Sequence, residues 1–339
     1  MKIAIDFSIL TLQKYGGIST YILMLTENLI KNGVKIDAIV NSKEIISRLP
    51  SSNSITIHYE KNYGRLHQFS RIRVPKTSSI LLSPYYRIPK CSNVEHVTVL
   101  HDLTLEKLRP IRSLLHRIIK IRSLNRANKI ICISNAIRKD LLNFAPTVGK
   151  KNIKVIYHGV NNEKIAVNTV EDEDYVVFLG SRAFYKRFDL AIEIVRELES
   201  CKLVVIGSPL STKELSQLEN RLTGRYVYLD NPSDKIVRTY LSQAICLLYP
   251  SEGEGFGLPI LEAFNMGCPV VISSDPALVE IGSHMASIVE TQNTASYVSA
   301  IDKLRLKGSS SKTKKEMANY ASNFTWKKTA LKTLMFINE

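Results

Sequence analysis

The sequence has little cysteine, and its five cysteines, Cys91, Cys132, Cys201, Cys246 and Cys268, are far apart and odd in number. Disulfide-stapled folds and zinc sites use even or closely paired cysteines, so we expect reduced thiols, mostly in the core. The N-terminus lacks the apolar run and cleavage site of a signal peptide, and no window holds the roughly 18 uninterrupted apolar residues of a membrane-spanning helix. We therefore expect a cytoplasmic protein that contacts membranes at most peripherally.

Acidic residues are scarce in the first half. Up to Val160 the sequence has 26 Lys and Arg against 9 Asp and Glu, a balance of +17, whereas the remainder balances at −2. Such a basic half favours an anionic partner: a membrane surface, a lipid-linked phosphate or a nucleic acid. A nucleic acid is disfavoured, because the basic stretches contain no aromatic series for base stacking and no recognised nucleic-acid motif.

Length and periodicity favour two α/β domains. The 339 residues, 45% of them hydrophobic, suit two cores better than one. Apolar strand-like runs alternate with amphipathic stretches, which is typical of parallel βαβ units, and the alternation restarts after the polar stretch Asn161 to Asp174. We expect two doubly wound Rossmann-like domains, 1–160 and 161–324. The expected strands are Ile3–Phe7, Val97–Leu100, Ile130–Ile133, Tyr175–Leu179, Leu203–Ile206, Tyr226–Leu229, Ile245–Tyr249 and Val270–Ile272; the expected helices are Ile18–Lys31, capped by Ser19 or Thr20, Leu190–Ser200, Thr212–Leu222 and Asp234–Gln243.

The glycine-rich stretch from Pro250 to Cys268 carries the chemistry. A strand ends in a glycine-rich turn, Pro259 suits the first position of a helix, and Gly267 ends that helix. Backbone N–H groups at a helix start bind phosphate, and glycines let a ligand approach closely. Glu254 and Glu262 can accept hydrogen bonds from vicinal hydroxyls. The stretch predicts a site for an anionic ligand with diols; the alternative is a plain turn with solvated carboxylates.

The same stretch resembles the donor-site signature of family 4 of the retaining glycosyltransferases, with Glu-x7-Glu followed by Gly-x-Pro-Val-Val, here Gly267 to Val271. Gly180-Ser-Arg-Ala-Phe-Tyr-Lys186 is similar to the family's Gly-x-Arg…Lys pair, Gly16-Gly17 to its N-terminal glycine loop, and His101 to its sugar-contacting histidine. The resemblance implies the GT-B fold, in which two Rossmann-like domains face a cleft. It also implies a final helix, 325–339, that packs back on the first domain.

The resemblance further implies donor binding mainly on the second domain and acceptor binding on the first, with no metal. Arg182 and Lys186 would stabilise the leaving diphosphate, Glu254 and His101 would position the sugar, and Glu262 would bind ribose. No carboxylate other than Glu254 is a candidate nucleophile, so a same-face displacement is favoured over double displacement. The other residues implied for the donor site are Gly16, Gly17, Ser181, Phe256, Gly257 and Leu258; Asp102 and Ser134 are secondary or acceptor-side candidates.

Two positions depart from the family's pattern. Arg187 follows Lys186, where relatives have Asn or Gly, and Glu252 doubles the acid at Glu254. A further feature is the basic segment from Glu106 to Arg126, in which apolar residues interleave with cations. Two interpretations of this segment stay open: a helix packed on its own sheet, or a surface that contacts an anionic membrane.

The Phe-Leu-Gly-Ser-Arg-x-x-Tyr-Lys form at 178–186 looks like bacterial mannosyl-type transferases. This favours a GDP-linked hexose donor, no further cofactor, and a glycan or lipid-linked oligosaccharide acceptor in the synthesis of a surface polysaccharide such as O-antigen or capsule. A nucleotide-sugar epimerase or a phosphorylase on the same scaffold stays open, because a fold alone does not select a reaction. A dinucleotide oxidoreductase is disfavoured, because the loop after the first strand lacks GxGxxG.

Overall fold

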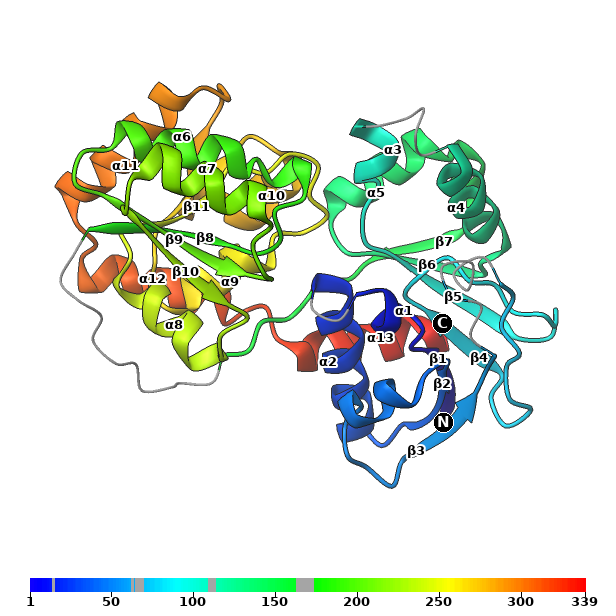
Figure 1. The fold of residues 1–339 in the computed structure, drawn as a ribbon. Helices are drawn as coiled ribbons and strands as arrows, with labels where there is room; N and C mark the ends of the chain where they lie inside the picture. The colour runs from blue at the N-terminus through cyan, green and yellow to red at the C-terminus, as the bar shows by residue number, and fades with distance from the viewer. Residues whose placement is uncertain (14–15, 62–63, 65–69, 109–113, 163–173) are drawn as a thin grey trace. The chain divides into compact units, whose positions relative to one another are not determined.

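The computed structural model describes residues 1–13, 16–61, 64, 70–108, 114–162 and 174–339. They form two compact units, one of Met1–Gly159 with Thr325–Glu339 and the other of Val160–Phe324 (Figure 1). The expected polar linker, Asn161 to Asp174, falls largely outside the described residues, which omit 163–173.

The first unit contains a seven-stranded sheet in the order β3-β2-β1-β4-β5-β6-β7. Every neighbouring pair in it is parallel. The strand order reverses between β1 and β4, and beyond the carboxyl ends of such a switch point doubly wound sheets bind their ligands. The strands are β1 (Lys2–Asp6), β2 (Lys35–Val40), β3 (Ile55–Tyr59), β4 (Ile80–Ser83), β5 (Glu95–Leu100), β6 (Lys129–Cys132) and β7 (Asn152–Val155).

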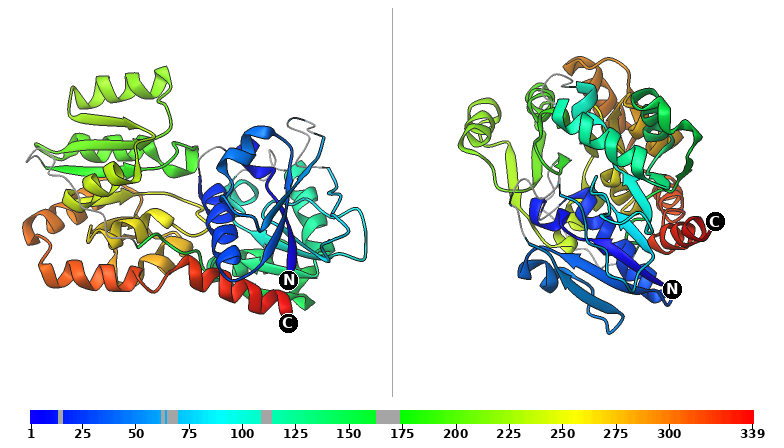
Figure 2. Two further views of the ribbon diagram at one scale, coloured as in Figure 1. Left: turned by 90° about the horizontal axis from the view of Figure 1, so that it is seen from below. Right: turned by 90° about the vertical axis from the view of Figure 1, so that its right-hand side faces the viewer.

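The helices of the first unit include one from the far end of the chain. Helix α13 (Trp326–Asn338) lies beside α2 (Gly17–Lys31), as the left view of Figure 2 shows. The Trp326 ring is 6.1 Å from Tyr21 of α2 and 5.8 Å from His158, measured between ring centroids. The other elements of this unit are α1 (Ile9–Leu12), η1 (Lys43–Arg48), α3 (Thr104–Leu108), α4 (Leu114–Arg126), α5 (Asn135–Phe144) and η3 (Pro146–Lys150).

The junction between His158 and the last helix requires a glycine. A Cβ on Gly159 would lie 2.1 Å from the backbone nitrogen of Trp326. The chain can therefore pass α13 this closely only without a side chain at 159.

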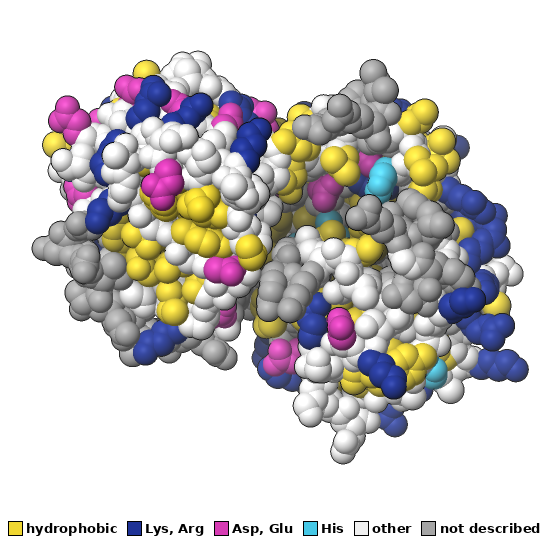
Figure 3. Space-filling model, viewed as in Figure 1, with side chains coloured by type: hydrophobic (Ala, Val, Ile, Leu, Met, Phe, Trp, Pro, Cys, Tyr) yellow, Lys and Arg dark blue, Asp and Glu magenta, His cyan; other side chains and the backbone are white. Residues whose placement is uncertain are grey.

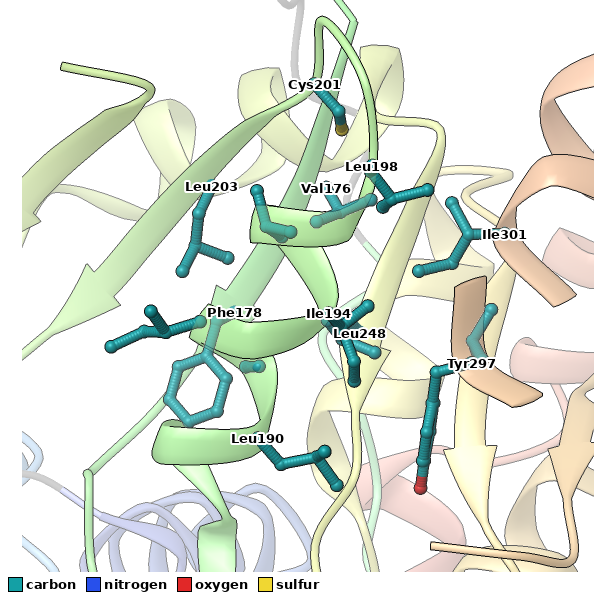
Figure 4. Packing of buried hydrophobic residues seen from close by; sticks show 14 of the residues in the cluster. Val176, Phe178, Leu190, Ile194, Leu198, Cys201, Leu203, Leu248, Tyr297 and Ile301 are labelled. Carbon is teal, nitrogen blue, oxygen red and sulfur yellow. The ribbon is translucent and has the colours of Figure 1, made fainter. Parts of the chain in front are cut away.

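The second unit contains a six-stranded parallel sheet in the order β10-β9-β8-β11-β12-β13, with its switch point between β8 and β11. Helix α6 packs its apolar face, including Leu190 and Ile194, on the sheet residues Val176 and Leu248 (Figure 4). The strands are β8 (Tyr175–Leu179), β9 (Lys202–Gly207), β10 (Tyr226–Asp230), β11 (Cys246–Tyr249), β12 (Val270–Ser273) and β13 (Ser287–Val289); the helices are η4 (Phe184–Lys186), α6 (Phe188–Glu197), α7 (Thr212–Leu222), α8 (Asp234–Gln243), α9 (Leu258–Asn265), α10 (Pro276–Gly282), η5 (Ser283–Met285), α11 (Thr294–Lys307) and α12 (Ser311–Ala321).

Two local expectations are wrong. Neither Ser19 nor Thr20 caps α2: the N-cap is Gly16, and the Ser19 hydroxyl donates instead to the Gln13 carbonyl at 2.5 Å. Helix α6 ends at Glu197 rather than Ser200, because the backbone becomes extended at Leu198. The other expected elements lie within two residues of the observed bounds.

The cysteines are all free thiols. Four of them are buried, as expected, but Cys91 is exposed.

Candidate functional site

Two loops leave the sheet of the second unit on either side of its switch point. One follows β8 and carries residues 180–186, and the other follows β11 and carries residues 250–257. Strands β8 and β11 are paired in parallel, with Val177 opposite Leu247, so both loops leave the same edge of the sheet. The motif from Gly180 to Lys186 and the glycine-rich stretch that begins at Pro250 therefore lie at the same edge of this sheet.

Lys186 and Glu254 form an ion pair between these loops. The Lys186 Nζ lies 2.5 Å from the Glu254 carboxylate and donates to the Tyr249 hydroxyl at 2.7 Å. Lys186 is buried, and its Nζ also lies 4.8 Å from the centre of the Tyr249 ring. Burial and the Glu254 carboxylate raise the pKa of Tyr249 well above its usual value, so this hydroxyl keeps its proton. The ammonium thus meets one carboxylate and one neutral acceptor.

The two residues that depart from the family's pattern contact each other. The Arg187 guanidinium lies 2.6 Å from the Glu252 carboxylate, and the backbone N–H of Glu252 donates to the Tyr185 carbonyl at 2.7 Å. Arg187 has a φ of 53°, a left-handed conformation, at the start of α6. The extra cation and the extra acid are therefore partners, and they hold the same two loops together.

Arg182 is fixed by the loop after β9 and by the first turn of α7. Its Nε donates to Glu214 at 3.0 Å, and its Nη2 donates to the Ser208 and Pro209 carbonyls at 2.7 Å each. Burial raises the pKa of Glu214, but hydrogen bonds from Ser211 and Arg182 outweigh it and lower the pKa overall. The Arg182 Nη1 is buried and has no hydrogen-bond partner among the described residues. One NH₂ group of the guanidinium is thus held in place without an acceptor from the part of the chain that the structure describes.

Glu262 lies on α9, and the residue as a whole is half-buried. Burial and the nearby Asp234 raise its pKa to about 7, against the opposing charge of Arg238. Near neutral pH this carboxyl therefore exists in both protonation states and can accept or donate a hydrogen bond.

The other residues expected in the donor site differ in accessibility. Ser181 is exposed just after β8, and Leu258, the first residue of α9, is half-buried. Gly257 caps α9 with a φ of 97°, and a Cβ there would lie 2.9 Å from Leu278. The Phe256 ring is buried and lies 6.5 Å from that of Phe324, so it packs inside the unit. Their contacts with a ligand stay predictions.

In the first unit, the glycine pair lies at the start of a helix and His101 at the carboxyl end of a strand. Gly16 and Gly17 begin α2, and a Cβ on Gly16 would lie 2.3 Å from the Gln13 side chain. His101 follows β5 and is buried edge-on against Tyr21, with ring centroids 4.9 Å apart. Its Nε2 has no hydrogen-bond partner among the described residues. Burial lowers its pKa to about 4, so the imidazole is neutral at physiological pH.

The two secondary candidates differ in how accessible they are. The Asp102 side chain is 41% exposed, and its backbone carbonyl accepts from Lys120 at 3.0 Å. The Ser134 hydroxyl is buried and accepts from the N–H of Ile137 at 3.1 Å, which caps α5. The Asp102 side chain is therefore accessible to an acceptor substrate, whereas the Ser134 hydroxyl caps α5. The functional roles of both residues stay predictions.

Sequence reasoning missed a buried ion cluster at the switch point of the first unit. Arg87, after β4, donates to Asp6 at the end of β1 at 2.9 Å and to Glu60 at 2.5 Å. Arg87 is 1% exposed and Asp6 is fully buried. The signal was present: Asp6 is a charged residue that ends a strand of buried apolar residues. The cluster joins the strands whose ends flank this switch point.

The described part of the chain contains neither a metal-ligand cluster nor a membrane-spanning helix. No group of three or more His, Cys, Asp or Glu side chains there is arranged to hold a metal ion. No helix of that part is long and apolar enough to span a bilayer.

Comparisons with known proteins assign the family. The family described as "Glycosyl transferases group 1" matches residues 160–324, and "Glycosyltransferase Family 4" matches residues 15–164. An O-antigen chain mannosyltransferase of Salmonella typhimurium is 26% identical over 59% of this chain and 59% of its own length.

Solved structures of low sequence identity share the fold. Sucrose-phosphate synthase from Thermosynechococcus elongatus has a TM-score of 0.81 at 15% identity, over 100% of this chain and 98% of its own. The Anabaena protein HepE, solved with UDP and glucose, has a TM-score of 0.74 at 15% identity, over 100% and 99%. The two family matches, over residues 15–164 and 160–324, show a family 4-like glycosyltransferase, and the solved structures show its GT-B fold.

Proposed function

We propose that this glycosyltransferase takes a hexose from a nucleotide diphosphate sugar and transfers it, with retention and without a metal, to a glycan or lipid-linked oligosaccharide of a bacterial surface polysaccharide. The observation that carries the proposal is the buried Lys186–Glu254 pair at the switch point of the second unit, with the Arg182 guanidinium on the same β8 loop. Two cations and a diol-binding carboxylate match a diphosphate joined to a sugar.

In this mechanism the charge of the leaving diphosphate is neutralised by side chains. The Arg182 Nη1 and the Lys186 ammonium bind its oxygens, so that a metal is unnecessary. The bond from the anomeric carbon to the diphosphate oxygen breaks while the acceptor hydroxyl attacks the same face, and the departing oxygen takes the hydroxyl proton. Glu254 holds sugar hydroxyls, Glu262 holds the ribose diol, and neutral His101 contributes a hydrogen bond to the sugar.

One relative and one solved structure support the proposed donor. The Salmonella relative is named a mannosyltransferase, which together with the 178–186 form favours a GDP-linked mannose or related deoxy sugar. The Anabaena structure holds UDP and glucose, which supports a nucleoside diphosphate as the leaving group on this fold. Thermal melts with GDP, UDP, TDP and ADP test the base, since a ligand at 100 times its Kd stabilises the native state by about 2.7 kcal/mol. Stabilisation by none of the four would contradict a nucleotide-sugar donor.

Transfer itself is tested with the matching nucleotide sugar and a lipid-linked or soluble glycan acceptor. We expect release of the nucleoside diphosphate, a glycoside of unchanged anomeric configuration, and the same rate in EDTA. Conversion of the nucleotide sugar without release of its diphosphate would identify an epimerase instead. Lys186→Ala and Glu254→Ala should abolish turnover, whereas Arg196→Ala, which alters an exposed ion pair of the same unit, should not.

We also propose that the first unit associates peripherally with an anionic membrane, on its cytoplasmic face. The basic segment is only partly packed: Leu114, Leu115 and Ile118 of α4 are 61%, 61% and 57% exposed. Exposed Lys and Arg side chains lie beside hydrophobic ones over α4 (Figure 3). Apolar side chains among cations suit insertion between anionic headgroups.

Vesicle sedimentation tests this association. The protein should bind vesicles rich in phosphatidylglycerol at low salt, and a Leu114→Ser/Leu115→Ser/Ile118→Ser variant should bind them more weakly. Leu306→Ser, which changes an 89% exposed leucine of the second unit, is the control. Equal retention on neutral vesicles, or no retention on anionic ones, would contradict the proposal. Residues 109–113 of the segment lie outside the described residues.

A further inference from the structure

Asp275 holds the loop that carries Glu254. It lies between β12 and α10, and its Oδ2 accepts from the backbone N–H of Gly253 at 2.7 Å and of Glu254 at 3.3 Å. Its Oδ1 accepts from the N–H of Ala277 at 3.0 Å and of Leu278 at 3.4 Å, which caps α10. A single carboxylate therefore joins a helix start to the backbone of the donor-site acid.

The arrangement requires a carboxylate rather than an amide. All four partners of Asp275 are N–H donors, two on each oxygen. An asparagine could still cap α10 through its oxygen, but its NH₂ would then point at the N–H groups of Gly253 and Glu254. Two donors cannot bond each other, so the loop would lose both contacts while the helix kept its cap.

A second set of bonds joins the same two loops. The Ser273 hydroxyl donates to the Ser251 carbonyl at 2.5 Å and accepts from the backbone N–H of Asp275 at 3.3 Å. The loop after β11 is therefore bonded to the loop after β12 at 251, 253 and 254. Lys186 reaches the Glu254 side chain from the β8 loop. The backbone of Glu254 is fixed by one neighbouring loop and its carboxylate by the other.

We propose that Asp275 is a positioning residue of the transferase: it fixes the backbone at Glu254 so that the Glu254 carboxylate meets the donor sugar. This inference rests on the proposed role of Glu254. Asp275 touches neither donor nor acceptor in it, and acts on the reaction only through Glu254. A displaced carboxylate no longer matches the transition state, and misplacement by about 1 Å can reduce turnover on the order of 100-fold.

The test compares Asp275→Asn with Asn293→Ala. The control removes the N-cap of α11, whose side chain accepts from Ser296 at 2.9 Å, and it leaves the donor loops intact. We expect Asp275→Asn to reduce kcat about 10-fold to 100-fold, with the affinity for GDP or UDP within about 2-fold of the wild type. Asn293→Ala should lower the melting temperature without reducing kcat. An Asp275→Asn enzyme with wild-type kcat would overturn the proposal.

A double-mutant cycle separates positioning from general destabilisation. In a Glu254→Gln background, Asp275→Asn should cause no further loss of kcat, because the residue through which it acts is already impaired. Independent, multiplicative losses would show that Asp275 acts otherwise and would overturn the inference. If Glu254→Gln alone keeps full turnover, the proposed function of Glu254 fails; if it is inactive while Asp275→Asn is fully active, only the positioning role fails.

Discussion

The Arg187 guanidinium lies 2.6 Å from the Glu252 carboxylate, beside the Lys186–Glu254 pair of 2.5 Å. The two pairs join the same two loops, yet their environments differ. The Lys186 and Glu254 side chains are 11% and 10% exposed, whereas those of Arg187 and Glu252 are 28% and 39% exposed. The inner pair is shielded from water and the outer pair is not, so we assign the chemistry to the inner pair and loop alignment to the outer one.

Charge exchange in the outer pair tests this division. Arg187→Glu places two acids together and should reduce turnover by about 10-fold, since repulsion displaces the β11 loop. Arg187→Glu/Glu252→Arg should recover most of it, because the pair is restored with opposite polarity. Steady-state kinetics of the single and double variants provide the measurement. If the double variant stays as impaired as the single one, Arg187 itself contacts the donor.

Glu262→Gln should make the protein more stable, and more so at pH 8 than at pH 5. The raised pKa of Glu262, about 7, means that the native state holds a proton that the unfolded chain releases near 4.5. Its stabilising contribution is complete below 4.5 and is lost as pH rises through 7. The gain at pH 8 should be about 1 to 2 kcal/mol, measured by urea unfolding. A gain that is the same at both pH values would contradict the raised pKa.

His101→Gln should reduce the acid sensitivity of the fold. The pKa of His101 is lowered to about 4, so below about pH 6.5 the unfolded chain binds a proton that the native state does not bind. Stability is therefore complete above pH 6.5 and is lost as pH falls towards 4. Between pH 7.5 and 5.0 the wild type should lose on the order of 1 to 2 kcal/mol more than His101→Gln. Equal losses in urea titrations would show that His101 is solvated.

Gly159→Ala should destabilise the first unit by about 3 kcal/mol, because the new Cβ would overlap the Trp326 backbone at 2.1 Å. Gly149→Ala is the matched control, since its nearest non-neighbour atom, Leu142 Cδ2, lies at an ordinary 3.7 Å. Thermal unfolding of both variants measures the difference. Similar melting temperatures would mean that α13 shifts to accommodate the methyl group.

The local parts of the structure were predictable from the sequence. The alternation of apolar runs identified the two sheets, and strands that end in glycines marked the loops with Arg182, Lys186 and Glu254. These signals lie within a few residues of one another, and backbone geometry converts them directly into a strand end or a helix start.

The contacts between distant segments were not predictable in the same way. Arg187 and Glu252 are 65 residues apart, and they meet because β8 pairs with β11, which no local pattern specifies. Asp275 was missed because an Asp before Pro is a common helix cap; its second role depends on the neighbouring β11 loop. Lys120, a cation of the basic segment, is buried against Glu106 at 2.7 Å, a pairing that the sequence pattern did not specify.

The packing of α13 against Gly159 makes the first unit depend on a segment that is synthesised after the second unit. The second unit is an insertion into the first, which is completed by the last segment of the chain, Thr325–Glu339. On the ribosome the inserted unit has all its residues before α13 emerges, so it can fold first while α2 still lacks the helix that covers it. A released chain truncated after residue 324 should therefore contain a protease-resistant second unit and an incomplete first one.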